Sequence, residues 1–153
     1  MAGTDNVESL LTTLQNTVEE VLAYFEGPGT TSKARVGDWG SWEVLAHFLY
    51  WHERTATGME SVALGTGPVT ITGETDATNA ESIKAVAGKS FQELVSEARR
   101  LQKQLDTAAR KVTDLDAVVM VRPEAPEGQT ARQRLERLAR HWLGHTEALR
   151  AQG

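Results

Sequence analysis

Apolar side chains recur at three- and four-residue intervals in four segments of the chain, the spacing of a helix with one buried face. In the first segment, residues 5–26, the apolar positions are Val7, Leu10, Leu11, Leu14, Val18, Val21, Leu22 and Phe25. Thr4 or Asp5 can cap its start through a side-chain oxygen. The sequence Gly-Pro-Gly at 27–29 is expected to end it, because neither residue type continues a helix well.

Three further helices are predicted, at residues 41–57, 79–108 and 130–151. The third predicted helix, which Asn79 is expected to cap, contains a break near Gly88, because Ser90 and Glu93 form a new capping box there. A long threonine- and glycine-rich loop, residues 57–79, separates the second and third helices, and only 69–71 reads as strand. In a second connection, 112–128, the sequence AVVMV at 117–121 favours a short extended segment.

Four amphipathic helices joined by polar connections predict an all-α fold, an up-and-down four-helix bundle with a long loop between its second and third helices. The length of 153 residues is typical of one domain, so we expect residues 1–153 to form a single bundle. Bundles of this kind carry metal or cofactor sites on facing helices.

The composition narrows the possible partners and location. A net charge of −5 argues against nucleic acid and against an anionic membrane surface, since both attract basic patches. No apolar run approaches the roughly 20 residues of a spanning helix, and the N-terminal sequence lacks the basic region of a signal peptide. We therefore expect a cytoplasmic protein. Without cysteine, a metal must be held by His, Asp or Glu, and thiol chemistry needs an external thiol.

Two of the four histidines, His141 and His145, lie four residues apart in the sequence RHWLGHTEAL at 140–149. With Leu135 at 0° and 100° per residue, they fall at about 240° and 280°, beside the apolar residues of the predicted helix. Their Cβ atoms are then about 5–6 Å apart, close enough for both imidazoles to bind one ion. Two interpretations stay open: buried histidines hydrogen-bonded to neighbours, or two ligands of a metal.

A third ligand would have to come from another helix, and the candidates are His47 and His52 in EVLAHFLYWHERT. With Trp42 at 0°, His52 falls at about 280°, on the apolar side, whereas His47 falls at about 140°. Periodicity alone therefore favours His52 as the residue that faces the bundle interior.

Three segments nevertheless resemble a known family. In WGSWEVLAHFLYWHER at 39–54, Val-Leu-Ala precedes a histidine that follows Trp39 by eight residues. TDATNAESIKAVAGKSFQELVSEARRLQKQL at 75–105 is similar to the family's Asp-x-x-Asn-Ala segment and kinked third helix, and His141-x-x-x-His145 matches its last helix. In order and spacing these segments resemble the DinB superfamily, particularly its DfsB-like and mycothiol-dependent maleylpyruvate isomerase-like branches.

The resemblance implies a four-helix bundle that binds a divalent metal, zinc or nickel, through His47, His141 and His145. His52 is then a core residue or a neighbour of the ligands rather than a ligand. The resemblance also implies an external low-molecular-weight thiol as cofactor, a small-molecule substrate, and pairing of two chains through helix faces.

Other residues near these histidines have both a functional and a structural interpretation. Glu43, one turn before His47, is a candidate general base, or a hydrogen-bond acceptor for the ring of a metal-ligating histidine. It is equally well explained as an acidic residue at the start of a helix, where a negative charge is favourable. Candidates for cofactor or substrate binding are Trp39, Trp51, Arg54 and Trp142, although tryptophan is more often packing and arginine more often solvated. The sequence RQRLERLAR at 132–140 reads as a solvated, salt-bridged helix face.

Three functional hypotheses follow. The first is a metal-dependent enzyme that performs thiol transfer, isomerisation or hydrolysis on a small molecule. The second is a small-molecule binding or stress-protection protein of the DfsB-like kind, with no essential metal. The third is a bundle whose role is association and whose histidines are structural.

Overall fold

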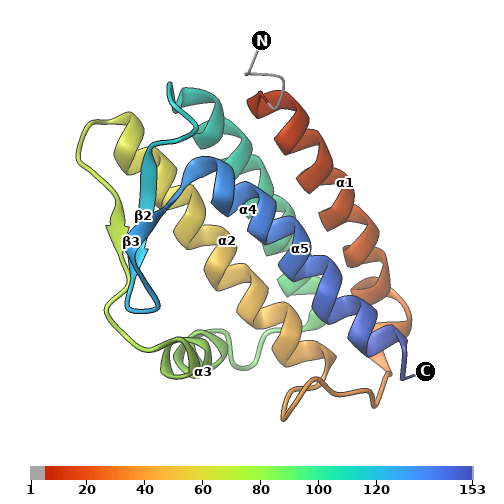
Figure 1. The fold of residues 1–153 in the computed structure, drawn as a ribbon. Coiled ribbons are helices and arrows are strands. Elements are labelled where there is room, and N and C mark those ends of the chain that lie inside the picture. Colours follow the sequence, from red (N-terminus) through yellow and green to blue (C-terminus); the bar gives the residue numbers. More distant parts are fainter. Residues whose placement is uncertain (1–5, 153) are drawn as a thin grey trace.

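The computed structural model describes residues 6–152, in which four long helices form a bundle (Figure 1). These helices are α1 (Val7–Glu26), α2 (Ser41–Ala63), α4 (Phe91–Lys111) and α5 (Ala131–Arg150). Both α1 and α2 pack mainly against α4 and α5, so α1 and α2 lie diagonally opposite each other. The predicted helical bundle is confirmed. No helix within residues 6–152 has the combination of length and apolar character that crossing a membrane requires.

The order of helix directions differs from a simple up-and-down arrangement. Helices α1 and α5 run one way, whereas α2 and α4 both run the other way (Figure 1). This is possible because the chain returns along the bundle between them, through strand β1 (Val69–Thr70) and helix α3 (Thr75–Ala85). The crossover places β1 and α3 outside the bundle, on the side of α2.

The predicted long loop at 57–79 is shorter in the structure. Helix α2 continues to Ala63 although Thr57 and Gly58 are poor helix formers. Ala56 and Met59, which flank these two residues, are buried. Tertiary packing therefore outweighs the low helix propensity of Thr57 and Gly58. At its other end, the loop is shortened because α3 begins at Thr75.

The helix ends follow the sequence in part. Predicted caps Thr4 and Asp5 lie outside the described residues, and Asn6 caps α1 through a hydrogen bond from Ser9 N. Helix α1 ends at Glu26, as predicted from the Gly-Pro-Gly sequence, and a 3₁₀ turn, η2 (Pro28–Thr30), follows it. Asn79 lies inside α3 rather than at its cap, a position that Glu74 occupies.

The break predicted near Gly88 is confirmed. Gly88 has a φ of +89°, a conformation that favours glycine. Two residues later, Ser90 caps α4: its hydroxyl accepts a hydrogen bond from Glu93 N, and the Glu93 carboxylate accepts one from Ser90 N. The predicted third helix is therefore two helices, because this capping box starts a new one.

A three-stranded sheet covers one side of α2. Strand β2 (Val118–Arg122) contains most of the predicted extended segment at 117–121. It pairs in parallel with β1 and antiparallel with β3 (Ala125–Thr130). The sequence did not predict β3, whose residues APEGQT include Pro and Gly. At Gly58 the α2 backbone approaches β2 so closely that a Cβ there would lie 2.3 Å from the Val119 carbonyl oxygen.

Candidate metal centre

Three histidines from two helices converge inside the bundle. His47 of α2 and His141 and His145 of α5 each offer one ring nitrogen, and these three nitrogens lie within 4.8 Å of one another. The ring centroids of His47 and His141 are 4.7 Å apart, as are those of His141 and His145. The four-residue spacing in α5 places two rings one turn apart on the same face, and α2 supplies the third. We call these three residues the histidine triad.

A backbone hydrogen bond sets the protonation state of His47. Its Nδ1 lies 2.8 Å from the Val44 carbonyl oxygen. A carbonyl oxygen only accepts hydrogen bonds, so Nδ1 carries the proton and Nε2 of the neutral ring carries a lone pair. That Nε2 lies 3.0 Å from Nε2 of His141. Two ring nitrogens at this distance share either a proton or a cation.

Burial keeps the triad neutral at neutral pH. Loss of solvation lowers the pKa of His47 to about 4, against a smaller opposing effect of the Val44 hydrogen bond. The pKa of His141 falls to about 2, chiefly through burial and then through the charges of His47 and His145. Burial also lowers the pKa of His145. Neutral imidazoles are the form that ligates metals.

His52, which helical periodicity favoured as the residue facing the bundle interior, is not part of this cluster. Its Nε2 donates a hydrogen bond to Gln102 Oε1 at 2.7 Å, and its Nδ1 accepts one from Trp142 Nε1 at 3.2 Å. Both ring nitrogens are thus used within the core. Periodicity fails here because α2 packs against α3, α4, α5 and β2 and has no single buried face. His47 is therefore buried as well, with 1% of its surface exposed.

The aromatic residues proposed as binding candidates have different positions. The Trp39 ring centroid lies 4.7 Å from that of His47, so Trp39 covers one ring of the triad. Trp142 is fully buried and stacks on Phe48 with 4.6 Å between ring centroids. Trp142 therefore packs in the core, which favours the structural interpretation of this residue.

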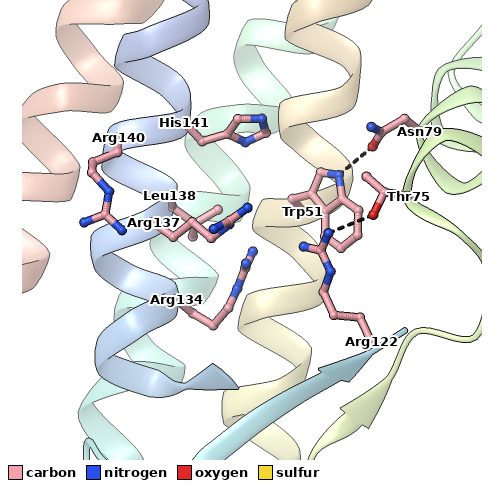
Figure 2. Close-up of a pocket in the computed structure, with 9 residues that line it drawn as sticks. All are labelled: Trp51, Thr75, Asn79, Arg122, Arg134, Arg137, Leu138, Arg140 and His141. Atoms are coloured by element: carbon pink, nitrogen blue, oxygen red, sulfur yellow. Dashed lines mark hydrogen bonds between the residues drawn. The ribbon is translucent and has the colours of Figure 1, made fainter. Parts of the chain in front are cut away.

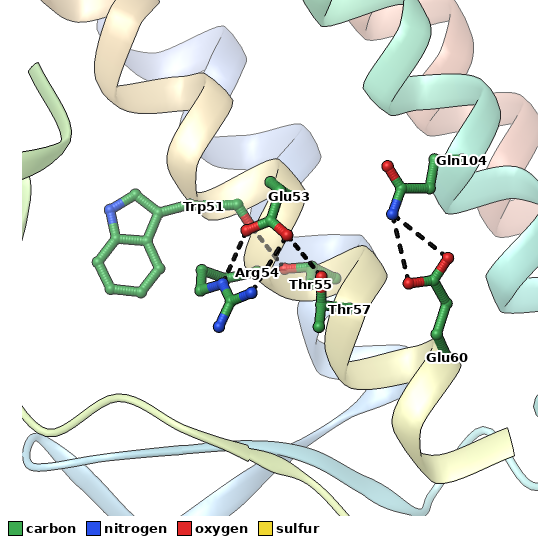
Figure 3. A network of polar contacts seen from close by, with 7 residues as sticks. All are labelled: Trp51, Glu53, Arg54, Thr55, Thr57, Glu60 and Gln104. Carbon is green, nitrogen blue, oxygen red and sulfur yellow. Dashed lines mark hydrogen bonds and ion pairs between the residues drawn. The ribbon is translucent and has the colours of Figure 1, made fainter. Parts of the chain in front are cut away.

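The charged candidates have partners of their own. Glu43 Oε1 accepts a hydrogen bond from Gly40 N at 2.9 Å, the capping interaction that its position at the start of α2 favours. Arg54 forms an ion pair of 2.7 Å with Glu53, which also accepts a hydrogen bond from Thr57 (Figure 3). Neither contact is with the triad, and for Glu43 and Arg54 the structure therefore favours the structural interpretation.

A cavity of about 260 Å³ adjoins the triad (Figure 2). His141 belongs to both, so one ring of the triad lines this space. Trp51, one of the predicted binding residues, lies in the wall and donates a hydrogen bond from Nε1 to Asn79 Oδ1 at 2.7 Å. The residues that line the cavity are Trp51, Thr75, Asn79, Arg122, Arg134, Arg137, Leu138, Arg140 and His141.

The sequence analysis missed the arginines of this wall. Arg134 and Arg137 belong to the run expected to be solvated, yet only 2% of the surface of Arg134 is exposed. A signal was present: at 100° per residue Arg134 falls at about 260°, between His141 and His145. Arg122 lay in a predicted connection, where periodicity gives no orientation, so the sequence offered no comparable signal.

Comparison with solved structures finds a fold match. The crystal structure of the mycothiol-dependent maleylpyruvate isomerase matches with a TM-score of 0.73 and 17% sequence identity over 94% of this chain. A structure of a histidine-to-alanine mutant of that isomerase matches with the same TM-score and 15% identity. The chain spans 60% of the length of either structure. This likeness confirms the DinB-like fold that the sequence resemblance implied. Neither protein-family models nor curated protein sequences give a match.

Proposed function

We propose that the protein is a metal-dependent enzyme that performs thiol transfer, isomerisation or hydrolysis on a small molecule. The proposed ligands of the ion are His47, His141 and His145. One observation carries this proposal: the Val44 carbonyl fixes the tautomer of His47, so that its Nε2 lone pair faces His141, in a cluster of three ring nitrogens within 4.8 Å of one another beside a cavity.

The donor set fits a divalent ion such as zinc or nickel, for which imidazole is a common ligand. Closed structural zinc sites have four protein ligands, whereas sites with three keep a position for water or substrate. A bound ion would supply Lewis acidity and lower the pKa of a coordinated water or thiol. The protein residues would orient the ligand rings and exclude water: Val44 holds His47, and Trp39 and Phe48 cover its faces.

An external low-molecular-weight thiol is part of this proposal. The chain has no cysteine, so a sulfur nucleophile has to be brought in. The solved structures of similar fold are those of a mycothiol-dependent enzyme. A thiol sulfur on the ion and a substrate in the adjoining cavity would lie next to each other.

Elemental analysis of purified protein tests the ligand set. We expect about one ion per chain in the wild type and loss of the ion in His47→Ala and in His141→Ala. His52→Gln is the matched control, because His52 is equally buried in α2, and it should retain the ion. Full metal content in His47→Ala, or loss confined to His52→Gln, would refute the assignment.

A non-catalytic binding or stress-protection role is the second candidate. It is favoured by the 3.0 Å separation of the His47 and His141 Nε2 atoms, a hydrogen-bond distance that needs no metal. Thiol-transfer assays with a panel of small thiols and electrophiles discriminate between the two. Metal-dependent turnover supports the enzyme, whereas stoichiometric binding without turnover supports the second role.

A further inference from the structure

The cavity beside His141 has a wall of cationic side chains. Four of its nine lining residues are arginines, Arg122, Arg134, Arg137 and Arg140, and none is Asp or Glu. This contrasts with the net charge of −5 of the whole chain. We propose that the cavity is a binding subsite for an oxyanion, a carboxylate or phosphate group carried by the substrate, with Arg122, Arg134 and Arg137 as its ligands.

Arg122 is held in place by neutral groups and keeps a donor free. Its Nη2 donates to Thr75 Oγ1 at 2.8 Å, and its Cζ lies 4.7 Å from the ring centroid of Trp51 (Figure 2). Its Nε is buried and has no hydrogen-bond partner among the described residues. The Glu124 carboxylate approaches this Nε only to 3.6 Å and is itself 42% exposed. The guanidinium is therefore oriented before any anion arrives.

Arg134 is a buried cation whose contacts are neutral. Its Nε donates to Thr55 Oγ1 at 3.1 Å and its Nη1 to Gln129 Oε1 at 3.2 Å. Within residues 6–152 no carboxylate lies at ion-pair distance from Arg134. A buried charge without a counter-ion is costly. Consistent with this, burial and the nearby charges of Arg122 and Arg137 lower the pKa of Arg134 to about 9. An oxyanion would supply the missing negative charge.

The dimensions and position of the cavity limit the ligand. A volume of about 260 Å³ lies just below the usual range of ligand pockets, which suits a small metabolite better than a nucleotide. Because His141 shares the wall, a molecule anchored at the arginines can extend to the triad. Assigning the anion to the substrate rests on the proposed function, whereas anion binding does not.

The test is titration calorimetry of the full-length protein with inorganic phosphate and with glutarate, at constant ionic strength. We expect saturable binding of at least one of these probes. Arg122→Gln and Arg137→Gln should each raise the dissociation constant about tenfold, the effect of losing a charge-assisted hydrogen bond. Arg100→Gln is the matched control, because Arg100 is an exposed arginine of α4 that pairs with Glu97; binding should be unchanged.

The two probes distinguish a phosphate from a carboxylate ligand, and binding of either supports the subsite. Equal loss in Arg100→Gln, or no saturable binding of either probe, overturns it. Arg137 is exposed, so its substitution tests the subsite even if Arg122→Gln fails to fold. Titration of His47→Ala, which should lack the ion, separates the two proposals: anion binding in this variant supports the subsite whatever the outcome of the elemental analysis.

Discussion

His47 and His52 lie five residues apart on α2 and share most of their physical properties. Both are buried, and for both, burial lowers the pKa to about 4. They differ in their partners: His52 uses both ring nitrogens in bonds to Gln102 and Trp142, whereas Nε2 of His47 faces Nε2 of His141, a residue that lines the cavity. Neither burial nor a shifted pKa therefore identifies a site. What distinguishes His47 from His52 is the lone pair that its Nε2 directs at His141.

The largest effect on folding should come from removing His52. His52→Ala leaves the Gln102 carbonyl and the Trp142 indole without partners and opens a cavity, so we expect a loss of roughly 2–4 kcal/mol. His145→Ala is the matched change in the triad and should cost less than about 1 kcal/mol, since His145 is only half-buried. Urea unfolding in the presence of a chelator measures both. Equal losses would contradict the contrast between the two groups.

Acid should lower the stability of the folded protein through protonation of His52. Its pKa is about 4 in the folded protein and about 6.5 when unfolded, so the unfolded chain takes up the proton first as pH falls. Its contribution is complete above pH 6.5 and is lost towards pH 4, by roughly 3 kcal/mol. In His52→Gln, which cannot ionise, stability should fall less steeply with decreasing pH between these values. Parallel pH profiles of the two proteins would exclude His52 as the source.

Two glycine substitutions, one near the α2–β2 contact and one near the triad, should have the smallest effects on stability. Gly58→Ala directs a Cβ at the Val119 carbonyl of β2, and we expect a loss of roughly 1–3 kcal/mol. Gly144 lies on α5 between His141 and His145, where a Cβ meets nothing within 4 Å. Gly144→Ala should therefore gain about 0.5–1 kcal/mol through helix propensity. Thermal unfolding of both variants checks the opposite signs; a loss in both would show that the triad is packed as tightly as the α2–β2 contact.

The sequence predicted the helices well where one face is buried. In α1 six of the eight predicted apolar positions are buried, and Val7 and Leu10 are half-buried. The break at Gly88 follows from local capping chemistry. The predictions from the sequence are wrong where tertiary contacts determine the secondary structure. The end of α2 reads as loop because of Thr57 and Gly58, and β3 forms through pairing with β2 although its own residues do not favour a strand.

The candidate site was predictable in its histidines but not in its arginines. The spacing of His141 and His145 placed both on one face, and family resemblance rather than periodicity selected His47. Arg134 had a similar angular position, but arginine is rarely buried without a partner, so a solvated interpretation was the natural one. Arg122 reaches the same space because β2, in the connection between α4 and α5, pairs with β1 and packs against α2, and neither contact is encoded locally.

The cavity has two walls of different origin. One is formed by α2 and α5, whose packing also maintains the bundle. The other is formed by α3, in the crossover between α2 and α4, and by the end of β2, in the connection between α4 and α5. Thr75, Asn79 and Arg122 therefore sit on two connections outside the four-helix bundle, which can vary in length and sequence while the helices that hold the imidazoles stay in register. Within this architecture, selectivity for one compound over another can evolve in these two connections without rebuilding the centre at which a reaction would occur.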